Sequence, residues 1–212
     1  MTKFKEVETC TAVDFRVRIT QLAEALSYMI SLGSEYVIEP HVTLLLSPST
    51  EDIYRKAVGE LRGYLQNLPA IQVLVSRLSY ERENRFLKVE VVGDNLLQIH
   101  MDLLTIIGKY RDGEIRKKDL QRIEQGKYNS EEIEHLREFG FLYSASRFNQ
   151  KITLGRIPEG VDEERIVEKV RQILLPILGE KRKIEEVNLM FHTDAVTQAE
   201  MKELEFEVIK LK

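Results

Sequence analysis

Apolar residues recur with two different periods along the chain. A period close to 3.6 residues predicts helices, whereas alternation or a short continuous apolar run predicts strands. Helical spacing is found over 19–30, 53–65, 95–110 and 162–178. Strand-like patterns are found over 41–46, 71–78, 85–92, 151–156, 184–192 and 203–211. This interleaving predicts an α+β protein, in which helices pack on sheets.

One strand has a counterpart about half the chain away. The apolar run 42–46 is bounded by Pro40 and Pro48 and is typical of a buried strand. Residues 151–154 repeat the pattern of 41–44, with lysine in place of histidine. In both halves a predicted helix and then two predicted strands follow this strand. The shared order indicates two variants of one unit.

Residues 111–140 differ from both units. They are rich in Lys, Arg, Glu and Gln, and their apolar positions are thinly spaced. This pattern predicts short helices that connect an N-terminal lobe, 1–110, to a C-terminal lobe, 141–212. Because no low-complexity or Pro/Gly-rich linker separates them, we expect one compact structural domain.

Composition excludes several classes of protein. Of 212 residues, 43% are hydrophobic and 31% charged, as in ordinary globular proteins. A formal net charge of −4 predicts no extended nucleic-acid surface, so any phosphate site must be local. With Cys10 as the single cysteine, no intrachain disulfide is expected. We expect a cytoplasmic protein with no membrane partner, because the chain has neither the apolar core of a signal peptide nor an apolar run of membrane-spanning length.

The strand at 41–46 carries the clearest candidate chemistry. Side chains alternate along a strand, so His41 and Thr43 share one face while Val42, Leu44 and Leu46 share the other. An imidazole exchanges protons near neutral pH, and both polar groups can bind a phosphate oxygen. The alternative is a strand histidine bonded to backbone beside a threonine that only favours the strand.

The two motif strands, His41-Val42-Thr43-Leu44 and Lys151-Ile152-Thr153-Leu154, resemble the 2H phosphoesterase superfamily, which includes the RNA cyclic phosphodiesterases often labelled 2'-5' RNA ligases. The resemblance runs from about residue 35 to the end. It implies two pseudo-repeated lobes, each an antiparallel sheet with outer helices, around a central cleft that holds a phosphate. It also implies proton transfer by His41 and phosphate binding by Thr43 and Thr153.

Lys151 departs from the family pattern, which has a second histidine at this position. Lysine at neutral pH is a point charge that can bind phosphate or stabilise developing negative charge. Lys151 is therefore expected to be the electrostatic partner of His41 in the site.

Three further residues are possible accessories. Arg147 is suited to clamping a phosphate, Tyr143 flanks the second motif strand, and His192 ends a predicted strand and is a spare base. The four histidines lack metal-ligand spacing, so neither a metal nor another cofactor is expected.

These features predict a 2H-like phosphoesterase that acts on a cyclic phosphate or a nucleotide-type phosphodiester. Its partner would be a small phosphorylated ligand or an RNA end. Two alternatives stay open. The first alternative is a non-catalytic descendant of the family that binds phosphate or nucleotide. The second is an interaction protein that docks through residues 111–140.

Overall fold

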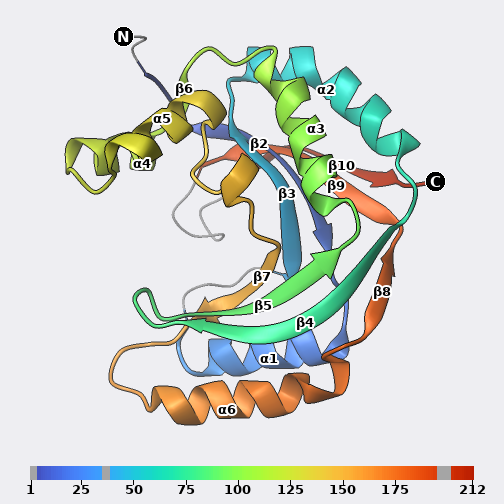
Figure 1. Cartoon of the computed structure of the whole chain (residues 1–212), viewed down its shortest axis with the longest axis vertical. Coiled ribbons are helices and arrows are strands. Elements are labelled where there is room, and N and C mark those ends of the chain that lie inside the picture. Colours follow the sequence, from blue (N-terminus) through green and yellow to red (C-terminus); the bar gives the residue numbers. More distant parts are fainter. Residues whose placement is uncertain (1–3, 35–38, 195–201) are drawn as a thin grey trace.

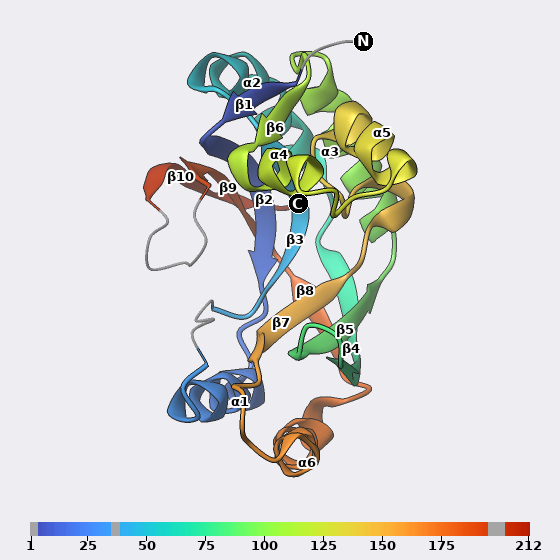
Figure 2. The same ribbon diagram turned by 90° about the vertical axis from the view of Figure 1, so that its left-hand side faces the viewer.

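The computed structural model describes residues 4–34, 39–194 and 202–212, which contain two four-stranded antiparallel sheets and one two-stranded parallel sheet (Figure 1). The first sheet has the order β10-β9-β2-β3, formed by Glu203–Lys210, Glu186–Thr193, Thr9–Arg16 and His41–Pro48. The second sheet has the order β7-β5-β4-β8, formed by Lys151–Arg156, Phe86–Gly93, Ile71–Glu81 and Lys181–Ile184. The edge strands β3 and β7 contact each other between the sheets (Figure 2).

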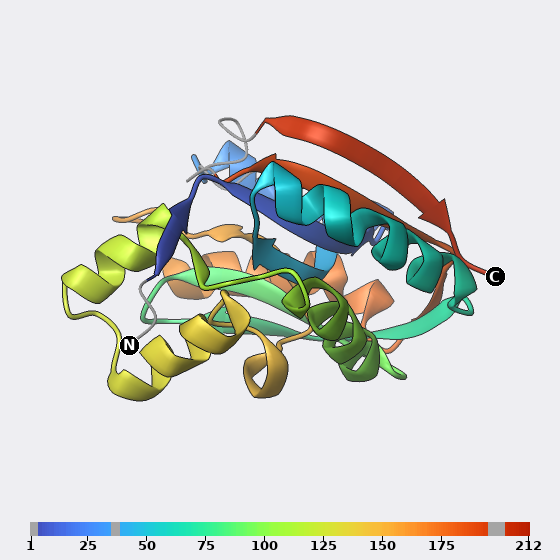
Figure 3. The same ribbon diagram turned by 90° about the horizontal axis from the view of Figure 1, so that it is seen from above.

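Four helices cover the outer faces of the sheets. They are α1 (Thr20–Ser31), α2 (Glu51–Asn67), α3 (Leu96–Gly108) and α6 (Glu163–Leu174). Helices α2 and α3 pack on the first sheet, with α2 along β9 and β10 (Figure 3). Helices α1 and α6 lie side by side against the second sheet (Figure 1). No helix within the described ranges is both long and apolar enough to cross a bilayer.

Helix α2 shows why local sequence decides these elements. The Thr50 side chain accepts a hydrogen bond from the backbone of Ile53, which satisfies one of the donors left free at a helix start. The carboxylates of Glu51 and Asp52 favour the same end, where the helix dipole is positive. Apolar residues four positions apart then bury one face against the first sheet, as their spacing predicts.

Each sheet takes two strands from each half of the chain. Strands β2 and β3 join β9 and β10, whereas β4 and β5 join β7 and β8. The order of elements along the chain suggested that one lobe is formed by 1–110 and the other by 141–212. The two sheets do not follow this division. The physical reason is the pairing of two strands. Strand β4 follows the motif strand β3 of the first sheet but pairs in the second, and β9 follows the motif strand β7 of the second sheet but pairs in the first. The α+β class and the two sheet lobes with outer helices are confirmed.

Residues 111–140 form a small layer of their own. Strand β6 (Glu114–Arg116) pairs in parallel with β1 (Lys5–Val7), and α4 (Lys117–Glu124) and α5 (Ser130–Phe139) follow. A capping box on Asn129 begins α5. Two short 3-10 helices complete the described elements, η1 (Ala145–Arg147) and η2 (Leu175–Ile177).

Candidate functional site

Strand β3 has a bulge within its motif. Consecutive residues of β2 face Thr43 and Leu45, so Leu44 is left out of the pairing. The bulge reverses the alternation after it. Leu46 therefore comes to the face of His41 and Thr43, rather than to the opposite face that strict alternation predicts.

His41 is half-buried, and its orientation is set by one hydrogen bond. Its Nδ1 lies 2.9 Å from the carbonyl oxygen of Glu39, an acceptor that requires the proton on Nδ1. In the neutral ring Nε2 is then the basic nitrogen, and it has no partner among the described residues. This arrangement suits a group that takes up a proton at Nε2.

Asp14 is a buried carboxylic acid that the sequence reasoning missed. It faces Thr43 across β2 and β3, and its Oδ1 accepts a hydrogen bond of 2.6 Å from the amide of Asn188 on β9. Burial raises the pKa of Asp14, while the nearby charges of His41 and Arg16 oppose that rise. A lone acid between Val13 and Phe15 in an apolar strand was the signal available in the sequence.

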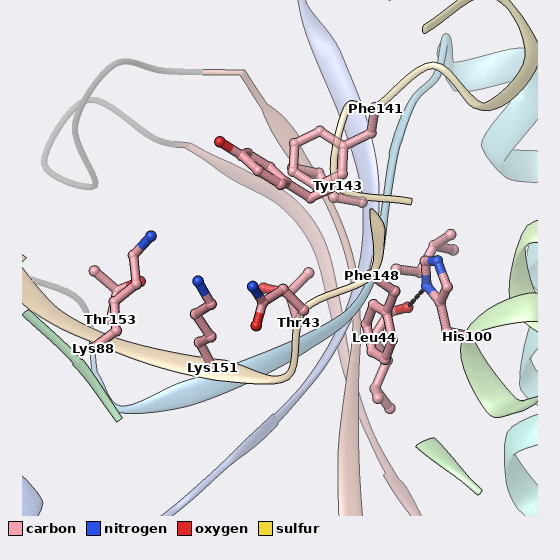
Figure 4. A pocket seen from close by; sticks show the side chains of 12 residues that line it. Thr43, Leu44, Lys88, His100, Phe141, Tyr143, Phe148, Lys151 and Thr153 are labelled. Carbon is pink, nitrogen blue, oxygen red and sulfur yellow. Dashed lines mark hydrogen bonds between the residues drawn. The ribbon is translucent and has the colours of Figure 1, made fainter. Parts of the chain in front are cut away.

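A pocket of about 250 Å³ lies where β3 and β7 meet (Figure 4). It contains Thr43 from the first motif strand, with Lys151 and Thr153 from the second. His41 is outside its lining, although it shares a face of β3 with Thr43. The pocket is also lined by Leu44, Leu45, Leu46, Lys88, His100, Phe141, Tyr143, Phe148 and Asn149. No group of His, Cys, Asp or Glu side chains in the described ranges is arranged to hold a metal ion.

Two lysines of the pocket share one carboxylate. The Nζ of Lys151 and of Lys88 lie 2.8 and 2.6 Å from the same oxygen, Oε1 of Glu81. The other carboxylate oxygen accepts a bond from Asn84. Although burial raises the pKa of Glu81, the hydrogen bonds from Lys151, Lys88 and Asn84 outweigh it and lower the pKa to about 2. Glu81 is therefore ionised at neutral pH and balances one of the two positive charges.

Aromatic side chains line the pocket across from the lysines. Phe141 and Tyr143 meet edge to face, with ring centroids 5.7 Å apart, and Tyr143 is 56% exposed (Figure 4). The guanidinium of Arg116 lies 4.8 Å from the Phe141 ring and supports it from β6. Residues 141–143 form a bend and a turn.

His100 joins the first motif strand to η1 by two buried hydrogen bonds. Its Nδ1 donates to the carbonyl of Leu44, 2.7 Å away, and its Nε2 accepts from the backbone N–H of Ala145, 2.8 Å away. Its ring also stacks on Phe148, with centroids 4.1 Å apart. Burial lowers the pKa of His100, so the ring is neutral, as one donor and one acceptor require. His100 thus holds the β3 bulge against the segment that leads into β7.

We expect His100→Leu to lower the free energy of unfolding by about 2–6 kcal/mol, because two buried backbone groups lose their partners at about 1–3 kcal/mol each. Urea unfolding followed by circular dichroism measures this loss. Gln98→Leu, at an exposed position of α3, is the matched control and should change stability by about 0.5 kcal/mol or less. Equal losses in the two variants would contradict the assigned role of His100.

The structure places two of the expected accessory residues outside the pocket lining. Arg147 lies in η1 and pairs with Glu131 and Glu132 of α5, at 3.2 and 3.3 Å. His192 is buried on β9 and faces Cys10 of β2, with its Nδ1 2.9 Å from the carbonyl of Thr193. Of the three expected accessories, only Tyr143 lines the pocket.

Neither a scan against protein-family models nor a sequence search of curated proteins finds a match. Solved structures do match over nearly the whole chain. Escherichia coli LigT in complex with ATP is 12% identical, with a TM-score of 0.54 over 95% of this chain and 98% of LigT. LigT in complex with 3'-AMP is 14% identical, with a TM-score of 0.52 over 96% and 99%. TT0787 of Thermus thermophilus is 11% identical, with a TM-score of 0.55 over 96% and 99%.

These likenesses establish the fold. The chain shares the architecture of LigT over nearly its whole length. The chain therefore has the fold of LigT and TT0787, with the two antiparallel sheets and outer helices that the resemblance implied.

Proposed function

We propose that this chain is a 2H-like phosphoesterase that hydrolyses a cyclic phosphate or a nucleotide-type phosphodiester. One observation carries the proposal. The two motif strands contact each other as β3 and β7, and Thr43, Lys151 and Thr153 line one pocket at that contact. Hydroxyl and ammonium donors around one small cavity are the groups that bind a phosphate.

In this proposal the phosphate lies against Thr43 and Thr153, whose hydroxyls donate to its oxygens. A water molecule attacks phosphorus, and Nε2 of His41 accepts one of its protons as the new P–O bond forms. The bond from phosphorus to one ribose oxygen breaks, and the Lys151 ammonium stabilises the charge that develops there. That oxygen takes up the proton that His41 releases through solvent, so that the product is a monoester with a free hydroxyl.

Asp14 supports this role of His41 by its charge. Burial raises the pKa of Asp14, and the charge of His41 is the largest of the influences that oppose this rise, so the two side chains are close enough to interact electrostatically. The Asn188 amide, 2.6 Å away, holds the carboxylate in place. Asp14 is therefore a positioning and electrostatic residue in this proposal.

The aromatic side of the pocket indicates what the phosphate is attached to. Tyr143 presents an exposed ring that a nucleobase could stack on, at about 1–3 kcal/mol per base. LigT has been solved in complex with ATP and with 3'-AMP. Together these observations favour a nucleotide or an RNA end as the ligand.

A second candidate function rests on Lys151. The chain has lysine where the family has its second histidine, and this lysine is held by Glu81 at 2.8 Å. A non-catalytic protein that binds a phosphorylated nucleotide would keep the pocket and dispense with the second proton-transfer group. The interaction-protein alternative instead needs docking through residues 111–140.

Incubation with the four 2',3'-cyclic nucleotides tests these functions directly. We expect release of a 2'- or 3'-nucleotide, measured by chromatography, and a rise in melting temperature with saturating cyclic nucleotide. Thermal stabilisation without turnover would favour the non-catalytic candidate. The absence of both would oppose both functions and leave the interaction protein.

A further inference from the structure

Glu81 lies beside the pocket and contacts both of its lysines. It is at the end of β4, and its Oε1 lies 2.6 Å from Lys88 of β5 and 2.8 Å from Lys151 of β7. All three side chains are at least two-thirds buried, with exposed fractions of 31, 17 and 20%. Contacts of this length between partly buried charges are screened less than surface ion pairs.

The carboxylate does not itself line the pocket. Lys88 and Lys151 do, and they extend from neighbouring strands on the same side as Thr153 (Figure 4). Asn84, in the hairpin turn, holds the second oxygen of Glu81 at 2.8 Å. Glu81 thus reaches the lysines without occupying the lining where the phosphate is proposed to bind.

The charge of this cluster is set by its three members. Two ammonium groups and one carboxylate leave a single net positive charge beside the pocket. Glu90, which faces Lys151 across β5 and β7, pairs with Arg77, with Nε 2.6 Å from Oε2, so that this pair is neutral as a whole. A cyclic phosphate or other phosphodiester carries one negative charge, whereas the monoester formed by its hydrolysis carries nearly two above its second pKa of roughly 6.

We propose that Glu81 determines the charge selectivity of the pocket, so that a singly charged phosphodiester is favoured over a doubly charged phosphomonoester. This inference rests on the proposed function, because it takes the phosphate to bind beside Lys88 and Lys151. In a hydrolase the same charge balance promotes release of the monoester product. In this way Glu81 is a specificity residue that touches the lysines rather than the substrate.

The expected size of the effect follows from Coulomb's law. The energy between the Glu81 charge and a ligand is proportional to the ligand's charge. At about 5 Å in water-like surroundings, removing the carboxylate strengthens binding roughly fourfold per negative charge of the ligand. The gain for a dianion is then the square of the gain for a monoanion, roughly sixteenfold.

Calorimetric titration at pH 8 with 2',3'-cyclic AMP and with 3'-AMP tests the proposal. All variants carry His41→Ala, so that the cyclic ligand stays intact. Adding Glu81→Gln is expected to tighten 3'-AMP roughly sixteenfold and the cyclic ligand roughly fourfold. The matched control, Glu168→Gln, removes the carboxylate of an exposed ion pair with Arg171 on α6, outside the pocket lining, and it should change both affinities less.

A second variant keeps the test independent of how Glu81→Gln folds. Lys88→Met leaves one lysine and one carboxylate, and it should weaken 3'-AMP more than the cyclic ligand. Equal changes for the two nucleotides, or a larger gain for the cyclic one in Glu81→Gln, overturn the proposal while leaving the proposed function intact. If neither nucleotide binds to the His41→Ala parent or to wild type, the proposed function and this inference are overturned together.

Discussion

Replacing His41 with alanine is expected to lower the turnover of a 2',3'-cyclic nucleotide by about 10²–10⁴-fold, the usual contribution of one proton-transfer group. The reason is the orientation of the ring. Its Nδ1 proton is directed to the Glu39 carbonyl at 2.9 Å, which makes Nε2 the base. The loss should appear in kcat, because the phosphate contacts come from Thr43, Thr153 and Lys151. Initial rates at saturating substrate measure it.

His192→Ala is the matched control for this experiment. His192 is on the same face of the first sheet as Asp14, but it faces Cys10 from β9 and is not on a motif strand. We expect kcat of this variant to stay within about threefold of wild type, since no proton-transfer step is assigned to it. Similar losses in both variants, or full activity in His41→Ala, would falsify the assignment of His41 as the base.

Replacing Lys151 with histidine is expected to raise turnover by roughly 10²-fold, the lower end of what a general acid or base contributes. The substitution rebuilds the histidine pair of the family on the contacting strands β3 and β7. Glu81 lies beside this position, and a carboxylate close to an imidazole favours its protonated form, which can donate to the leaving oxygen. Rates for wild type and variant under identical conditions measure the gain.

Lys88→His is the matched control, because it exchanges the other lysine bound to Glu81 without rebuilding the motif. This variant should show no gain in turnover over wild type. An inactive wild type with an active Lys151→His variant would show that the pocket persists without its catalyst, which favours the non-catalytic candidate. An active wild type that loses turnover in Lys151→His would instead assign a chemical role to the lysine itself.

Part of the candidate site could be predicted from the sequence. His41, Thr43, Lys151 and Thr153 stand out because two similar apolar strands carry polar residues at equivalent positions. The carboxylate that controls the lysines could not be found in this way. Glu81 is 70 residues from Lys151 along the chain and meets it only because β4, β5 and β7 are neighbours in one sheet. A charged residue between two predicted strands, here 71–78 and 85–92, is otherwise typical of a solvated turn.

The residues around His41 illustrate the same limit. Asp14 faces Thr43 only because the bulge at Leu44 changes the register between β2 and β3. His100 looked like one more helical histidine, yet it binds Leu44 and Ala145, which are 56 and 45 residues away. Neither the bulge nor these contacts produce a periodic pattern in the sequence, since they depend on which distant segments of the chain pack together.

The sequence by itself determined the helices, most of the strands, the duplicated motif and the candidate residues on its two strands. These features follow from the local spacing of residue types, because side-chain direction repeats every 3.6 residues in a helix and every two in a strand. Only the tertiary structure decided that β4 and β9 cross between the sheets, that Arg147 pairs with α5 and that Glu81 joins Lys88 to Lys151. Such outcomes depend on the free energy of packing and pairing between distant segments, where hydrogen bonds and register are settled by the whole chain at once.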